Sequence, residues 1–185
     1  MNVAKMSLMN IDSVSSSVIF TKSECFNIIK LAERKPISEA EYFAPSGAGK
    51  NPDIRSATVI QLTDESISSH IFSSMKKMNR LEFEVSRLEP LQLIKYEVGD
   101  HYVWHTDWSP VNNKKRKLSM TVQLTDSQDY DGGNVEILDG PELRTIDRGI
   151  GMATVFPSWA VHRVTPVTSG TRWALVAWAV GKPFR

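Results

Sequence analysis

The sequence has a single cysteine and no long apolar run. Cys25 cannot form an intrachain disulfide, so we expect a reducing compartment such as the cytoplasm. No run approaches the roughly 18 apolar residues of a membrane span, and residues 1–20 lack the basic and apolar regions of a secretory signal. The 22 basic and 21 acidic residues nearly balance, so the composition does not predict nucleic acid or an anionic membrane as a partner.

The length and composition predict one globular domain with helices in its first half. The 185 residues can bury a core, and 41% hydrophobic with 23% charged residues is typical of a folded protein. Thr21 and Glu24 have the spacing of a capping box at the start of one helix. Thr63 or Asp64 could cap a second helix that runs to about Leu81.

The second half of the sequence is a series of short β-strand patterns, most of them separated by Gly, Pro, Asp or Asn. These runs are 82–87, 91–98, 101–107, 117–125, 134–139, 143–147, 152–156, 161–167 and 171–180. Short strands at this spacing are typical of a sandwich or barrel. We therefore expect an α+β, mainly β fold in a single domain over 1–185. In it, 1–88 would form a helical support layer and 89–185 a double-stranded β-helix (jelly roll).

Three side chains have the chemistry of a metal site. His105 and Asp107 are two residues apart in a predicted strand, so their side chains leave the same face. His162, a second imidazole, lies in another strand-like and largely apolar run. Two histidines and one carboxylate with open positions suit a non-haem Fe(II) oxygenase. The alternatives are a solvent-exposed strand for the first pair and a hydrogen-bonded core histidine for His162.

Arg172 follows a turn signal, residues 168–170, that is expected to close a hairpin. In that hairpin His162 would stand opposite Val176 and Arg172 opposite Pro166, so His162 and Arg172 would face the same side of the sheet. A guanidinium makes two parallel bonds to a carboxylate, so Arg172 could hold one end of a short diacid whose other end binds the metal. The alternative is a surface arginine, which the apolar run after Arg172 disfavours because it predicts a strand buried on both faces.

Two tyrosines and a glutamine are further candidates for contact with that diacid. Tyr96 and Tyr102 flank a predicted turn, and a phenol can donate a hydrogen bond to a carboxylate. Gln123 alternates with Ser119 and Thr121 along one face of a predicted strand. This polar face either lines a cavity or meets water, and the tyrosines could be there simply because aromatic residues favour strands.

Together these residues belong to a spaced set that covers about residues 90–181. The set is Tyr96-x-x-Gly99-x-x-Tyr102-x-x-His105-x-Asp107, Gly132-Gly133, Phe156-Pro157-Ser158, His162-x-Val164-x-Pro166, Gly170-x-Arg172 and Trp178. It resembles the 2-oxoglutarate/Fe(II)-dependent dioxygenases of the prolyl 4-hydroxylase-like group. The resemblance implies iron held by His105, Asp107 and His162, and 2-oxoglutarate held by Arg172 with help from Tyr96.

The resemblance also implies an enzyme that uses Fe(II), 2-oxoglutarate and O2, with ascorbate as the reductant, to hydroxylate a substrate C–H bond. Peptidyl proline is the first substrate that it suggests, followed by a free amino acid or another small molecule. Collagen-type enzymes of the group usually carry lysine where this chain has Arg172, which points to the arginine-bearing branch. Nucleobase-dealkylating enzymes usually carry a second arginine where this chain has Trp178, so no nucleic-acid partner is expected.

A rival hypothesis keeps the fold without the reaction. A non-catalytic jelly-roll module could bind a metal or a partner, and it would not need an arginine for a diacid.

In the enzyme hypothesis, the breaker-rich loop at 44–53 and the turn at Gly132-Gly133 are expected to border the mouth of the site and to select the substrate.

Overall fold

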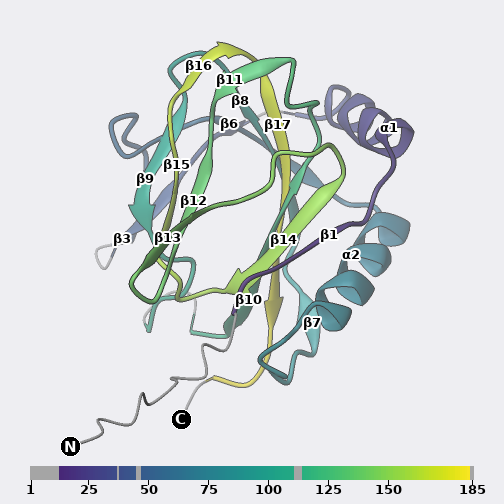
Figure 1. Ribbon diagram of the computed structural model, residues 1–185, viewed down its shortest axis with the longest axis vertical. Helices are drawn as coiled ribbons and strands as arrows, with labels where there is room; N and C mark the ends of the chain where they lie inside the picture. Colours follow the sequence, from purple (N-terminus) through teal and green to yellow (C-terminus); the bar gives the residue numbers. More distant parts are fainter. Residues whose placement is uncertain (1–12, 37, 45–46, 111–113, 184–185) are drawn as a thin grey trace, which may run out of the picture.

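The chain folds into two antiparallel β-sheets that face each other, with two helices on the outside of the larger sheet (Figure 1). The computed structural model describes residues 13–36, 38–44, 47–110 and 114–183. The larger sheet has the order β1 (Ser15–Val18), β14 (Met152–Pro157), β10 (Arg116–Gln123), β17 (Arg172–Val180), β8 (Leu91–Tyr96), β6 (Thr58–Leu62) and β2 (Ser38–Glu39), with β7 (Arg87–Leu88) paired to β17. This arrangement confirms the predicted mainly β, jelly-roll fold.

The smaller sheet has five strands, and two separate two-stranded ribbons complete the β-structure of the described residues. Its order is β13 (Glu142–Thr145), β12 (Val135–Asp139), β15 (His162–Val164), β9 (His101–His105) and β5 (Arg55–Ser56). The ribbons are β11 (Tyr130–Gly132) with β16 (Val167–Gly170), and β3 (Tyr42–Ala44) with β4 (Gly47–Gly49).

Both predicted helices are present, and both begin where their caps were expected. In α1 (Lys22–Ala32), the Thr21 side chain caps the Glu24 N–H and the Glu24 carboxylate accepts from the Thr21 backbone, which completes the capping box. In α2 (Glu65–Lys77), Asp64 is the N-cap, and its carboxylate accepts from the N–H of Ile67. Neither helix, over the residues described, is long and apolar enough to cross a membrane.

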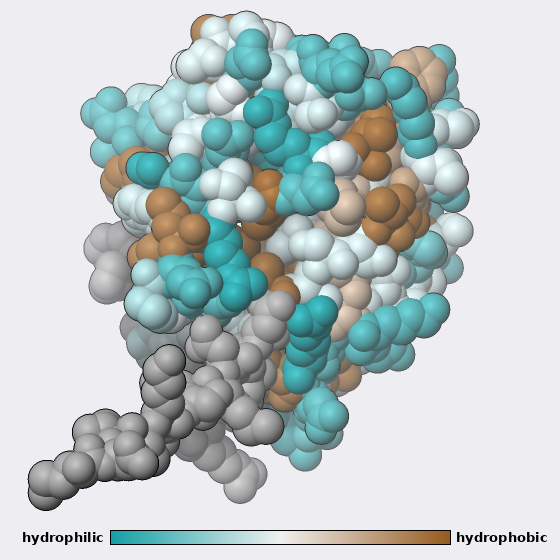
Figure 2. Space-filling model, in the orientation of Figure 1, coloured by the Kyte–Doolittle hydropathy of each residue, from teal (hydrophilic) through white to brown (hydrophobic). Residues whose placement is uncertain are grey.

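The helices cover the outer face of the larger sheet and form the main core with it. Cys25 and Ile28 of α1, and Ile71 of α2, are fully buried in this cluster with Leu175 and Ala177 of β17. Hydrophobic side chains on the face seen in Figure 2 lie in separate groups among hydrophilic ones, as expected once the main apolar faces are buried.

The strand β17 is buried on both faces, as its continuous apolar sequence predicts. Leu175 and Ala177 point to the helices, whereas Arg172, Val176 and Trp178 alternate with them and line the space between the two sheets. A second core, which includes Tyr96, lies on that inner side. Arg172, the one charged residue of β17, is therefore held beside hydrophobic side chains of both cores.

The predicted hairpin between the His162 and Arg172 segments is wrong. His162 pairs with Ile137 and His105 in the smaller sheet, whereas Arg172 pairs with Tyr96 in the larger sheet. The segment between them forms β16, which pairs with β11, so the chain crosses from one sheet to the other. His162 and Arg172 face a common space because the two sheets face each other, and not because they share a sheet.

The first half of the chain supplies strands as well as helices. The strand β6 pairs with β8 in the larger sheet, and β5 pairs with β9 in the smaller one. This sharing supports the proposal that residues 1–185 form one domain, although residue 88 does not divide helices from sheets. The predicted strand at 82–87 is reduced to β7, and the predicted loop at 44–53 includes part of the β3–β4 hairpin, with residues 45–46 outside the described part.

Candidate active site

A cavity of about 630 Å³ opens between the two sheets. The larger sheet lines it with Arg116 and Ser119 of β10, with Tyr96 of β8 and with the inner face of β17. The smaller sheet contributes side chains from β9 and β15. The predicted site residues that line this cavity are Tyr96, Tyr102, His105, Asp107, His162 and Arg172.

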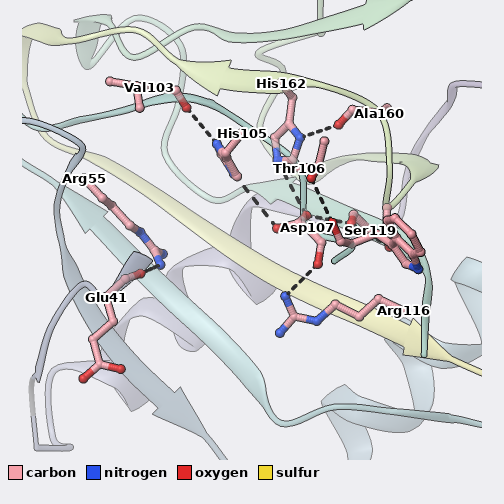
Figure 3. A network of polar contacts seen from close by, with 12 residues as sticks. Glu41, Arg55, Val103, His105, Thr106, Asp107, Arg116, Ser119, Ala160 and His162 are labelled. Carbon is pink, nitrogen blue, oxygen red and sulfur yellow. Dashed lines mark hydrogen bonds and ion pairs between the residues drawn. The ribbon is translucent and has the colours of Figure 1, made fainter. Parts of the chain in front are cut away.

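The structure brings the three predicted metal ligands together. His105 and His162 are cross-strand partners on β9 and β15, and their ring centroids are 4.1 Å apart. Asp107 follows β9, and its carboxylate lies 4.0 Å from His105 Nε2 and 3.5 Å from His162 Nε2. One ligand atom from each residue lies within 4.8 Å of the other two, and the three side chains point toward one another (Figure 3).

Both imidazoles are oriented by backbone carbonyls of their own strands. His105 Nδ1 is 2.8 Å from the Val103 carbonyl oxygen, and His162 Nδ1 is 2.9 Å from the Ala160 carbonyl oxygen. Because a carbonyl can only accept, each Nδ1 carries the proton and each Nε2 keeps a lone pair. Both lone pairs are therefore available to a metal, and the ring planes are fixed before it binds.

Asp107 is anchored through its backbone and its side chain. Its N–H donates to the Ser158 carbonyl at 2.9 Å, and its Oδ2 accepts from the Ser119 hydroxyl at 2.7 Å. The Arg116 guanidinium donates to the Asp107 carbonyl at 3.4 Å and is neutralised by Glu89, with N–O distances of 2.6 and 2.9 Å. Oδ1 makes no hydrogen bond within the described structure and lies 4.0 Å from His105 Nε2, whereas Oδ2 is the oxygen that lies 3.5 Å from His162 Nε2.

Burial and neighbouring charges shift the pKa values of His105 and Asp107 in the direction that a metal needs. Burial, reinforced by His162, lowers the pKa of His105 to about 3. For Asp107, burial raises the pKa, but His162, His105 and Arg116 together outweigh it and bring the value to about 2. A neutral imidazole and an ionised carboxylate are the forms that bind metals.

Arg172 lies at the far end of the cavity and is only 1% exposed. Its Nε and Nη2 donate to Gln123 Oε1 at 3.2 and 3.0 Å, and its guanidinium carbon is 5.2 Å from the ring centre of Tyr96, its cross-strand partner. Gln123 does not line the cavity and accepts from Arg172 instead, so its direct contact with a co-substrate stays a prediction. Within the described chain, Arg172 has no carboxylate partner.

Tyr102 contacts the metal-site histidine and not Arg172. Its ring stacks on His105 with centroids 3.4 Å apart and an interplanar angle of 17°. The Arg55 guanidinium lies over Tyr102, 4.7 Å from its ring centre, and burial raises the pKa of the Tyr102 phenol to about 12. Tyr102 therefore stays protonated and supports the plane of the His105 ring.

Sequence reasoning missed three contributors to the site. Ser119 stood in an alternating polar pattern that could line a cavity or meet water, and its hydrogen bond to Asp107 joins segments that are distant in the sequence. Arg116 looked like part of a solvated basic run, yet it is 7% exposed. Gly133 was expected at the mouth, whereas a Cβ there would lie 3.0 Å from Cδ of Arg172.

The fold and the site together define an Fe(II)-type oxygenase scaffold, and the comparisons with known proteins agree. The chain belongs to the 2OG-Fe(II) oxygenase superfamily, whose family model matches residues 91–180. A PKHD-type hydroxylase from Sphingopyxis alaskensis is 31% identical over 162 residues, which is 80% of this chain and 74% of that protein. A PKHD-type hydroxylase from Idiomarina loihiensis is 36% identical over 84 residues, 45% of this chain and 38% of that protein.

Solved structures show the same fold at low sequence identity. A prolyl-4-hydroxylase from Pseudomonas putida superposes with a TM-score of 0.75 at 15% identity, covering 92% of this chain and 93% of that one. A Trichoplax adhaerens prolyl hydroxylase, in complex with a hypoxia inducible factor peptide fragment, also gives 0.75 at 16% identity, covering 92% and 84%. The matched region is only about two fifths of several curated relatives, for example 42% of one from Synechococcus.

Proposed function

We propose that this protein is a 2-oxoglutarate- and Fe(II)-dependent dioxygenase that hydroxylates a C–H bond of its substrate. The observation that carries the proposal is the convergence of His105, Asp107 and His162 in one cavity with a buried arginine, Arg172, that has no carboxylate partner among the described residues. Membership of the superfamily supports the same reaction class.

The residues present fit a divalent iron. Two Nε2 lone pairs and one carboxylate oxygen of Asp107 converge, and this two-histidine, one-carboxylate set leaves positions open for further ligands. His105, Asp107 and His162 would hold the metal, and Tyr102 and Ser119 would keep His105 and Asp107 in place. Bound there with 2-oxoglutarate and O2, the metal supplies the oxidising chemistry that couples decarboxylation of the 2-oxo acid to hydroxylation.

Arg172 fits the distal carboxylate of 2-oxoglutarate. A buried cation without a counter-ion is costly, and a ligand carboxylate would relieve that cost through charge-assisted hydrogen bonds. Gln123 fixes the guanidinium from behind by accepting from Nε and Nη2, and Tyr96 lies beside it in the cavity, where its phenol could donate to the same carboxylate. In this proposal the cavity binds the distal carboxylate of the diacid at its Arg172 end and the metal at its His105, Asp107 and His162 end.

We infer a peptide substrate, with proline as the first residue type to test. The peptide complex of the Trichoplax prolyl hydroxylase and the name of the Pseudomonas enzyme support this choice. We expect ascorbate to sustain turnover by keeping the iron reduced.

The experiment measures thermal stability and succinate release on the same preparation. 2-Oxoglutarate should raise the melting temperature only when Fe(II) is present under nitrogen, and at about 100 times its dissociation constant it should add about 2.7 kcal/mol. Arg172→Ala should abolish that shift, whereas Arg144→Ala, on β13 outside the cavity, should keep it.

Two results would contradict the assignment. The first is a 2-oxoglutarate shift that survives in Arg172→Ala or in the absence of metal. The second is full succinate release by His105→Ala. A metal-dependent shift without any 2-oxoglutarate effect would instead favour the non-catalytic metal-binding module.

A further inference from the structure

Oε1 of Gln92 and Nε1 of Trp178 are buried atoms of cavity-lining side chains on neighbouring strands of the larger sheet, and neither makes a hydrogen bond with any described residue. Nε of Arg55, which also lines the cavity, is a further buried donor of this kind. Trp178 is only 6% exposed. A buried polar atom without a partner costs about 1–3 kcal/mol, so an orphan acceptor and an orphan donor in one cavity call for an explanation.

The two side chains are neighbours on the inner face of the larger sheet. Gln92 of β8 stands opposite Val176 of β17, and Trp178 is two residues further along the same face. Such diagonal positions have Cα atoms roughly 7–8 Å apart, within reach of one small group placed between them. An acceptor and a donor therefore flank one place in the cavity.

This place lies beside the metal ligands and away from Arg172. Trp178 is the cross-strand partner of Ser119, which donates to Asp107. Along β17, Trp178 and Arg172 are six residues apart, or about 20 Å at roughly 3.3 Å per residue. If 2-oxoglutarate occupies the Arg172 end, the Gln92 and Trp178 end is left for the substrate.

We propose that Gln92 is a specificity-determining residue which, with Trp178, binds an uncharged amide group of the substrate. The inference rests on the proposed dioxygenase function. An amide carbonyl accepts from the indole Nε1–H, and an amide N–H donates to the Gln92 carboxamide oxygen. Neither side chain carries a charge, so the pair matches an internal peptide group and does not match a free carboxylate or ammonium.

Two further observations favour an internal residue of a peptide over a free amino acid. Arg116, which lies 3.9 Å from the Trp178 ring, is already neutralised by Glu89. Trp104 and Trp159 line the cavity and remain 38% and 41% exposed, so part of the apolar lining meets solvent. We expect a peptide to cover more of these indoles than a single amino acid would.

The test compares two matched sets of probes. The protein is loaded with Fe(II) and 2-oxoglutarate under nitrogen, so that binding occurs without turnover. It is then titrated with free amino acids and with the same amino acids blocked as N-acetyl methylamides. Binding is followed by the side-chain N–H resonance of Trp178, which is assigned by its loss in Trp178→Phe.

The blocked amino acids should bind and shift the Trp178 resonance, whereas the free ones should not. Gln92→Leu should weaken binding of the best blocked probe by about tenfold. It should leave the metal-dependent 2-oxoglutarate shift unchanged and should not lower the melting temperature, because it removes a buried polar atom that has no partner in the fold. Gln128→Leu, at an exposed position outside the cavity, is the matched control and should bind like the wild type.

Three results would overturn the inference while the dioxygenase assignment stands. Free amino acids could bind better than blocked ones, as expected if the Arg55 guanidinium takes their carboxylate. Gln92→Leu could bind the blocked probe with wild-type affinity. The third such result is that no probe binds, although 2-oxoglutarate still stabilises the metal-loaded protein. Loss of that 2-oxoglutarate effect in the wild type would reject the proposed function itself.

Discussion

Replacing Gln123 by leucine should destabilise the protein by leaving Arg172 without its hydrogen-bond acceptor. The carboxamide oxygen of Gln123 accepts from both Nε and Nη2 of a guanidinium that is 1% exposed. Leucine has a similar volume, so the packing loss is small. The main effect of Gln123→Leu is therefore that the buried Arg172 guanidinium loses the two hydrogen bonds that it donates to Gln123 in the wild type.

The size of the effect follows from that single acceptor. A hydrogen bond to a charged group contributes about 1.5–3 kcal/mol, so we expect Gln123→Leu to cost about 2 kcal/mol. For a protein of this length each kcal/mol shifts the melting temperature by about 2–4 °C, which gives a decrease of about 4–8 °C. Gln61→Leu, at an exposed position of β6, should change the unfolding free energy by less than about 0.5 kcal/mol.

The double variant Arg172→Met/Gln123→Leu separates this cause from a packing defect. It removes the charge together with its acceptor, and replacing a buried polar pair by apolar side chains is often neutral or stabilising. We therefore expect its melting temperature to return close to that of the wild type, whereas the 2-oxoglutarate shift is lost. The reasoning is refuted if Gln123→Leu melts like the wild type, or if the double variant is no more stable than the single one.

Three further predictions concern the metal ligands and Gly133. Because burial lowers the pKa of His105 to about 3, this residue binds up to one proton more in the unfolded chain than in the folded chain between about pH 6.5 and pH 3. Metal-free protein should therefore lose at most about 1.4 kcal/mol per pH unit from pH 6.5 toward 3, and His105→Gln should flatten this loss in urea unfolding. Ser119→Ala should weaken metal binding by about 10–100-fold in calorimetric titrations, because Asp107 loses its hydroxyl donor. Gly133→Ala and Gly140→Ala both place alanine at positive φ, +58° and +62°, but only Gly133 has neighbours within 4 Å. Both should lose stability, and only Gly133→Ala should also lose the 2-oxoglutarate shift. Equal shifts in the two variants would contradict a role for Gly133 in seating Arg172.

Local sequence signals predicted the elements well because they depend on short-range chemistry. The capping box at Thr21 and Glu24 is visible in the sequence and complete in the structure. The two-residue spacing of His105 and Asp107 anticipated that both would point inward from one segment. The continuous apolar run of β17 anticipated a strand with both faces buried.

The pairing of distant segments was predicted less well. The turn signal at 168–170 suggested a hairpin, but residues 167–170 pair with β11 instead, and the chain then enters the other sheet. A turn pattern specifies that the chain bends; it does not specify which edge the next strand joins. Arg172 still faces His162, because β15 and β17 lie on sheets whose inner sides meet.

The sequence by itself determined the residue types of the site, their alternation along each strand and the family to which the chain belongs, because these depend on local spacing. Only the tertiary structure decided that His105 pairs with His162, that Gln123 lies behind Arg172 and that Gln92 stands diagonal to Trp178. Those relations arise when two sheets bury their inner faces against each other. Register and sheet order are set by that long-range packing, which no short stretch of sequence encodes.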